Sequence, residues 1–321
     1  MTVPDADKYK AWSRHSVSPE AWLISLPDVC IDELDEVVAA IRARPEGPVE
    51  ELTPEEFSLD ACTAIMAQVR TKLEHHIGLA VVDRFPVERY RLQENRAIAW
   101  LLARMLGQVV AQKWNGIRLY DVKDTGQALG YGVRRSVTNL GLPFHTDGGW
   151  LWMPPAFVGL YCLQSGQEGG ISRFVSLVTV HNELRRLHPD LLDRLYRPFV
   201  WDRQAEHGPD DLPYARQPVF EHAGRTLIGR YFEDYVVTGS KLAGEPLDDD
   251  GRAAFAAMRA IVEDPAHWVE FRIETGQLQY LNNRQFAHSR TAFTDSADGA
   301  PRHMLRLWNR DEGTPHLEGQ T

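Results

Sequence analysis

Pairs of histidine with a nearby carboxylate are the first candidates for chemistry in this sequence, because both groups bind metal ions. The pattern His-x-Asp/Glu occurs four times in a chain with 12 histidines, so chance alone can produce it. The pairs are His145/Asp147, His181/Glu183, His188/Asp190 and His316/Glu318. Local structure must decide which pair can converge on one ion.

Three of these pairs are poorly placed. Residues two apart on a helix diverge by about 200°, so they cannot easily face one ion. His181 and Glu183 lie in a helical pattern, and we assign them to a solvated face. His188 precedes a proline at a helix boundary, and His316 lies in the polar C-terminal segment.

His145 and Asp147 lie in a different setting, because the surrounding segment 142–149 contains a proline and two adjacent glycines. This composition predicts a strand that runs into a turn, where residues i and i+2 point to the same side. Two imidazoles and one carboxylate are the ligand set of non-haem Fe(II) oxygenases. We predict that His288, which follows the strand-like run Gln277–Leu281, is the third ligand.

Arginines in an apolar run are the second candidate feature. Arg302 and Arg306 are four residues apart in a strand-like segment and should share one face. We expect this strand to pair with the strand that carries His288. Inward guanidinium groups need anionic partners, and they match carboxylates in a bidentate fork. Structural ion pairs are the alternative explanation. Ser172 follows Gly169-Gly170 and offers a hydroxyl group at the start of a strand, although such a segment alone indicates a turn.

The elements that would position these residues change along the chain. The first ~115 residues favour helices, at Ile31–Arg44, from a capping box at Thr53-Pro54-Glu55-Glu56 to His75, and over Val87–Val110, with a β-like run at Leu79–Phe85. Helices are also predicted at Val178–Tyr196 and Arg252–Val262. The rest consists of short strand-like runs, several of them separated by glycine turns: Ile117–Val122, Phe157–Leu163, Ser172–Ser176, Pro218–His222, Thr226–Tyr231, Val269–Glu274, Gln277–Leu281 and His303–Arg310. Many short strands predict a sandwich or barrel.

We therefore predict one domain over residues 1–321, mainly β with a helical N-terminal part. Residues 1–115 form that helical part, 116–310 the β core with helical insertions, and 311–321 a polar tail that should fray. A chain of this size with 43% hydrophobic residues can bury a large core.

The amino-acid composition limits the classes of partner that this protein is expected to bind. The net charge of −10 and the lack of a Lys/Arg run argue against nucleic acid. The sequence has no apolar stretch of ~18 residues for a membrane and no segment like a signal peptide. Cys30, Cys62 and Cys162 are too scattered for a disulfide framework, and we expect buried thiols in the cytoplasm. A small-molecule substrate is the expected partner, and a homo-oligomer is compatible with these data.

Taken in order, the motifs resemble those of a known family. They are His145-Thr-Asp147-Gly, Gly169-Gly170-Ile-Ser172, Asn283-Arg-x-x-x-His288-Ser-Arg290-Thr-Ala-Phe293-x-Asp295 and Arg302-His-x-x-Arg306-Leu-Trp. Together they are similar to the taurine dioxygenase/clavaminate synthase-like superfamily of Fe(II), 2-oxoglutarate-dependent oxygenases. The resemblance covers about residues 115–310.

This resemblance implies a double-stranded β-helix, or jelly roll, with iron on His145, Asp147 and His288. It implies that Arg302, fourteen residues after the distal histidine, and Ser172 bind 2-oxoglutarate. The co-substrate and O2 would be converted to succinate and CO2 while the substrate is hydroxylated, and desaturation or cyclisation uses the same ligands.

Substrate contacts are less well defined by the sequence. The resemblance links Arg306 to a substrate carboxylate or sulfonate in some members, while an internal partner such as Asp295 or Glu274 is the alternative. Asn283 and Trp150 are further candidates, and we predict a small carboxylate-bearing or amino-acid-derived substrate. Further segments predicted to border the pocket contain Trp152, Arg134, Arg135, Asn139, Arg230, Tyr231 and Phe232.

Two other functions use the same residues. A zinc hydrolase takes such ligands with one open water position, but it would not need Arg302 and Ser172. A non-catalytic β-helix that binds a small molecule would have no need for intact metal ligands.

Overall fold

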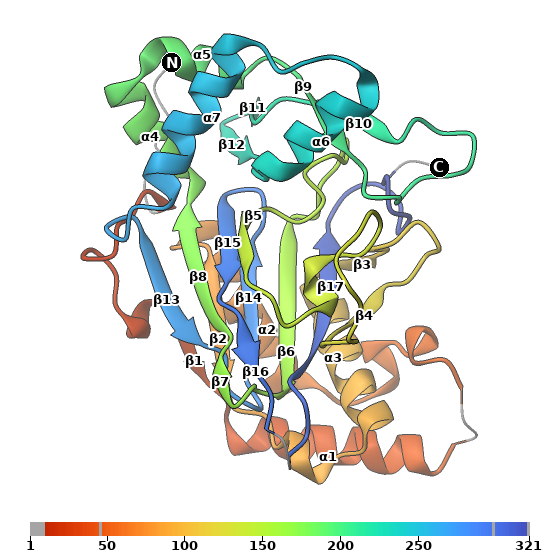
Figure 1. Ribbon diagram of the computed structural model, residues 1–321. Helices are drawn as coiled ribbons and strands as arrows, with labels where there is room; N and C mark the ends of the chain where they lie inside the picture. The colour runs from red at the N-terminus through yellow and green to blue at the C-terminus, as the bar shows by residue number, and fades with distance from the viewer. Residues whose placement is uncertain (1–9, 45–46, 297–298, 320–321) are drawn as a thin grey trace.

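The computed structural model describes residues 10–44, 47–296 and 299–319, which form a mixed sheet-and-helix fold (Figure 1). Its larger sheet has seven strands, and the smaller main sheet has four. The order in the larger sheet is β1 (Leu23–Ser25), β2 (Leu79–Asp83), β14 (Leu278–Asn282), β6 (Phe157–Gln164), β17 (His303–Arg310) and β3 (Gln108–Val110), with β4 (Leu119–Val122) also paired to β17. The order in the smaller sheet is β13 (Trp268–Arg272), β8 (Ile171–Ser176), β15 (Phe286–Arg290) and β5 (Leu142–His145).

The alternation of side chains along β17 explains how the larger sheet is covered on both faces. Leu305 and Leu307 pack into a hydrophobic cluster with the N-terminal helices. Met304, Arg306 and Trp308 occupy the alternate positions, toward the smaller sheet, and Arg302 lies just before the strand. All four side chains are buried. The helices on the outer face are α1 (Asp28–Arg42), α2 (Asp60–His75) and α3 (Leu92–Leu106).

A long insertion between β8 and β13 gathers at one end of the two sheets (Figure 1). It shares a hydrophobic cluster with residues of both sheets. Its elements are α4 (Leu177–Leu187), α5 (Pro189–Leu195), β9 (Phe199–Asp202), β10 (Tyr214–Gln217), β11 (Phe220–Ala223), β12 (Thr226–Gly229), α6 (Glu233–Ala243) and α7 (Asp249–Val262). The short strands β7 (Glu168–Gly169) and β16 (Phe293–Thr294) pair with each other.

Most predicted helices and strands are present, with two informative differences. The capping box at Thr53 forms, but only the short 3-10 turn Pro54–Glu56 follows it. The helix starts again at Asp60, where the Glu33 carboxylate accepts hydrogen bonds from its first free backbone N–H groups. Helix α6 (Glu233–Ala243) was not predicted at all.

Three further predictions need correction. The strand after Arg302 does not pair with the strand of His288: β17 belongs to the larger sheet and β15 to the smaller one. The described part of the tail does not fray, because Leu317 is buried and Arg310 donates to the carbonyl of His316. His181 is not on a solvated face but is 1% exposed.

The cysteines are in the state that we predicted. All three cysteines are buried and free. Among the residues that the structure describes, no helix is long and apolar enough to cross a membrane.

Candidate active site

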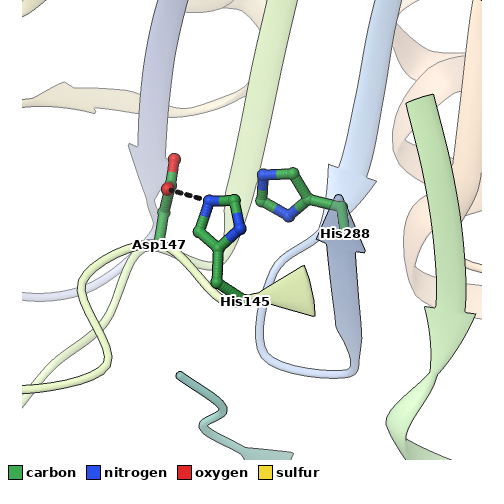
Figure 2. Close-up of side chains that lie close together, drawn as sticks. All are labelled: His145, Asp147 and His288. Atoms are coloured by element: carbon green, nitrogen blue, oxygen red, sulfur yellow. Dashed lines mark ion pairs between the residues drawn. The ribbon is translucent and has the colours of Figure 1, made fainter. Parts of the chain in front are cut away.

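The predicted metal ligands come together at one edge of the smaller sheet. His145 ends β5, Asp147 lies in the turn that follows, and His288 is the central residue of β15. His145 and His288 are directly opposite each other in the antiparallel register, so their side chains leave the same face of the sheet. One ligand atom from each of the three residues lies within 4.8 Å of the others. Figure 2 shows that the three side chains point toward a common region.

The turn that carries Asp147 is held by buried contacts. Gly148 has φ +65°, and a Cβ atom there would lie 2.8 Å from the side chain of Leu151, which explains the glycine after the ligand. The side-chain oxygen of Asn283 accepts a hydrogen bond from the Asp147 backbone N–H at 2.8 Å. Its amide nitrogen donates to the backbone carbonyls of Asp147 and Pro155. The amide of Asn283 is thus used inside the protein, which makes it a positioning residue rather than the substrate contact that we predicted.

The carboxylate of Asp147 is oriented by residues from the opposite sheet. Trp308 Nε1 donates to Oδ2 at 2.9 Å, and Arg306 Nη1 lies 3.2 Å from the same oxygen. Burial alone would raise the pKa of Asp147, but the Arg306 charge and the two histidines hold that pKa well below its usual value. Asp147 is therefore ionised at neutral pH, as a metal ligand must be.

The hydrogen bond of the His145 imidazole leaves its other ring nitrogen facing the site. Nδ1 of His145 lies 2.9 Å from the carbonyl oxygen of Pro143, which can only accept, so Nδ1 carries a proton. Nε2 of His145 faces the site, 3.4 Å from Asp147 Oδ1. Burial lowers the pKa of His288 to about 3, so its ring is neutral. The donor set fits a divalent transition metal.

The predicted co-substrate residues lie farther along the same interior. Arg302 is 2% exposed, and among the described residues no carboxylate forms an ion pair with its guanidinium group. Its Nη1 atom has no hydrogen-bond partner. Asp295 accepts a hydrogen bond from the Arg302 backbone N–H, not from its side chain. Ser172 is buried on β8, directly across from Arg290 of β15. A buried, unpaired guanidinium group is costly, so it points to an absent anion.

A small cavity adjoins the triad. It holds about 30 Å³, which is room for roughly one or two waters. Trp150, Arg134 and Arg306 line it, together with Arg135, Ser136, Phe232, Tyr235 and Trp308. Trp150, Arg134, Arg135 and Phe232 were predicted to border the pocket. Trp152 does not line it and is 65% exposed.

The contacts of Arg306 correct the expected internal pairing. Its partners are Asp147 and the side-chain oxygen of Gln112, 2.7 Å from Nε, rather than Asp295 or Glu274. The Nη2 atom of Arg306 is buried beside the cavity without a partner. Arg306 therefore contacts a predicted metal ligand and still has one N–H group without an acceptor.

A family model described as "Taurine catabolism dioxygenase TauD, TfdA family" matches residues 46–308. The chain belongs to the TauD/TfdA dioxygenase family. Among curated relatives, FR-33289 synthase of Streptomyces rubellomurinus is 28% identical, covering 92% of this chain and 88% of that protein. The taurine hydroxylase-like protein SAT17 of Stachybotrys chartarum is 26% identical, covering 88% of this chain and 75% of that protein.

Solved structures of similar shape show that the TauD/TfdA-family chain has the fold of these oxygenases. Asparagine oxygenase in complex with Fe(II), 2S,3S-3-hydroxyasparagine and succinate superposes with a TM-score of 0.68 at 19% identity, covering 90% of this chain and 94% of that one. The non-haem iron oxygenase OrfP with Fe, succinate and (3S)-hydroxy-L-Arg gives a TM-score of 0.66 at 15% identity, with the same coverage.

Some residues of this TauD/TfdA-family site were not predicted from the sequence. Trp308 could have been found, because it occupies the same strand face as Arg306, two residues away. Gln112 and Tyr235 carry no local signal. The same is true of Glu206, which pairs with Arg134 at 2.9 Å across 72 residues of sequence.

Proposed function

We propose that this enzyme is an Fe(II), 2-oxoglutarate-dependent oxygenase that hydroxylates a small substrate and releases succinate and CO2. The observation that carries the proposal is the combination of two features in one interior. The His145, Asp147 and His288 triad lies beside a cavity, and Arg302, a buried arginine without an anion, lies just before β17 of the opposite sheet.

In this proposal His145, Asp147 and His288 hold the iron. Bound iron and 2-oxoglutarate supply the oxidising chemistry with O2. Arg302 and the hydroxyl group of Ser172 bind the distal carboxylate of the co-substrate, and Trp308 keeps the Asp147 carboxylate in one orientation. The buried walls exclude water from the reaction.

The proposed substrate is a small molecule that carries a carboxylate or is derived from an amino acid. Arg306 has an unpartnered N–H group at the cavity, and the indole N–H of Trp150 there is also buried without a partner. Both groups are donors, which favours a substrate with acceptor oxygens. The titles of the asparagine oxygenase and OrfP structures name hydroxylated amino acids as their ligands, which supports the same class here.

The proposal includes a double-stranded β-helix as the core. Two mainly antiparallel sheets with their buried faces toward each other, and a metal site at the edge of the smaller sheet, support this description.

An anaerobic titration tests the function. We expect a visible metal-to-ligand charge-transfer band when Fe(II) and then 2-oxoglutarate are added to the wild type. The band should be absent in His145→Ala, Asp147→Ala and His288→Ala, and present in His75→Ala, a matched control on an exposed histidine. A wild type that binds Zn(II) tightly but gives no band with Fe(II) and 2-oxoglutarate would point to the zinc hydrolase instead.

A further inference from the structure

Two buried arginines flank one aromatic ring in the proposed co-substrate site. The guanidinium carbon of Arg290 lies 4.8 Å from the ring centroid of Phe293, and that of Arg302 lies 5.0 Å from it. The two arginines are 8% and 2% exposed. Nε of Arg290 and Nη1 of Arg302 are both buried without a hydrogen-bond partner. Within residues 10–44, 47–296 and 299–319, neither guanidinium group forms an ion pair with a carboxylate.

Two like charges in a buried region are unfavourable without an anion. Nε of Arg290 and Nη1 of Arg302 lack an acceptor, and the two guanidinium groups lack a carboxylate to balance their charge. A bound carboxylate would relieve both effects, because it would give each guanidinium group an acceptor and an opposite charge.

The position of Arg290 matches the path of a ligand that starts at the metal. Arg290 follows His288 by two residues on β15, so both side chains leave the same face of the strand, about 7 Å apart. On the neighbouring strand, Phe174 is opposite His288 and Ser172 is opposite Arg290. In 2-oxoglutarate two methylene groups separate the keto acid from the distal carboxylate. A keto acid held by the predicted metal ligands would have its distal carboxylate within reach of the part of β15 and β8 that carries Arg290 and Ser172.

Arg290 also holds segment 134–141 in place, and part of this segment lines the cavity beside the triad. Its Nη2 atom donates to the carbonyl oxygens of Thr138, at 3.0 Å, and of Leu140. Nearby, the backbone N–H of Phe293 donates to the carbonyl of Asn139 at 3.0 Å. The residues just before these, 134–136, line the cavity.

We infer that Arg290 is a second positioning residue for the distal carboxylate of 2-oxoglutarate, and that it couples co-substrate binding to segment 134–141. The inference rests on the proposed function. One guanidinium group contacts the segment through Nη2 and has its Nε atom free for the carboxylate. Binding at one side stabilises the arrangement at the other, and the coupling is reciprocal. Co-substrate binding thus fixes the segment that forms one wall of the substrate cavity.

The first experiment measures binding rather than turnover. Anaerobic Fe(II) protein is titrated with 2-oxoglutarate and with 2-oxovalerate, which has the same chain length but no distal carboxylate. For Arg290→Met we expect about tenfold weaker binding of 2-oxoglutarate and unchanged binding of 2-oxovalerate. Arg290→Lys keeps the charge and should lose less than Arg290→Met. Arg173→Met, a half-exposed arginine on the neighbouring strand that pairs with Glu270, is the matched control.

The second experiment follows segment 134–141 by hydrogen–deuterium exchange in the Mn(II) protein. Saturating 2-oxoglutarate should slow exchange in the wild type and in Arg173→Met, but much less in Arg290→Met and Arg290→Lys, which cannot hold both carbonyls and the carboxylate. Wild-type affinity of Arg290→Met for 2-oxoglutarate would overturn the role in binding. Equal protection in the wild type and both Arg290 variants would overturn the coupling. If Arg302→Met also binds 2-oxoglutarate normally, the co-substrate site itself is wrong.

Discussion

The indole N–H of Trp308 donates a hydrogen bond of 2.9 Å to Oδ2 of Asp147, and this contact joins the two sheets at the metal site. Trp308 lies on β17 of the larger sheet, whereas Asp147 follows β5 of the smaller one. Trp308 holds Oδ2, while Oδ1 lies 3.4 Å from Nε2 of His145. The orientation of this predicted metal ligand thus depends on how the sheets pack.

Replacing Trp308 with Phe should therefore weaken metal binding while the fold survives. Loss of a hydrogen bond to a ligating carboxylate typically costs about 10- to 100-fold in metal affinity. Competition titration with a Mn(II) chelator measures the effect, and Trp152→Phe is the control because Trp152 is 65% exposed. Equal metal affinity of Trp308→Phe and wild type would show that the packing of the sheets alone fixes Asp147.

Replacing Arg302 with Ala should raise the KM for 2-oxoglutarate with a smaller effect on kcat at saturation. Removing one partner of a buried ion pair costs on the order of 2–5 kcal/mol. Arg173→Ala serves as the control, since Arg173 is paired with Glu270 at the surface. An unchanged KM for 2-oxoglutarate would move the carboxylate site to another arginine, with Arg306 as the next candidate.

Replacing Arg306 with Gln tests the substrate proposal. In the wild type, candidate acids should release succinate faster than their methyl esters or amides, and the variant should lose this preference. Because Arg306 also contacts Asp147 at 3.2 Å, the metal content of the variant must be measured in parallel. Equal turnover of acids and esters by the wild type, or intact acid turnover by a metal-replete variant, would leave Arg306 with a structural role only.

The buried His181 should make the protein less stable in mild acid. Its Nε2 atom lies 2.7 Å from the hydroxyl group of Tyr196, while burial, and then the charges of Arg185 and His222, lower its pKa from 6.5 to about 4. The folded state thus binds the proton less readily than the unfolded state. The contribution of His181 to the free energy of unfolding is complete above pH 6.5 and is lost as the pH falls toward 4.

Between pH 6.5 and 5, protonation linked to His181 should lower the free energy of unfolding by roughly 2 kcal/mol. Urea unfolding of the metal-free protein at both pH values measures it. His181→Gln should show a smaller decrease than the wild type, while His75→Gln, at an exposed histidine, should behave like the wild type. The same decrease in all three proteins would assign the acid sensitivity to other groups.

Local patterns were sufficient to predict much of this site. His145 and Asp147 were identified because a proline and two glycines exclude a helix there, and alternation in a strand turns both side chains to one side. Arg302 and Arg306 were placed on one face for the same reason, and both are buried. The roles of Arg302 and Ser172 in 2-oxoglutarate binding stay predictions.

Contacts between distant parts of the chain were decided only by the tertiary structure. Local patterns do not indicate that the strand of His288 and the strand that follows Arg302 belong to different sheets, because strand pairing is set by packing and register across the whole core. The chain from Arg306 to Asp147 spans 159 residues, and that from Gln112 to Arg306 spans 194. No local propensity encodes such contacts. The sequence by itself therefore determined which groups can do chemistry, whereas folding decided which of them meet, since each buried charge takes the partner that the packed sheets bring within reach.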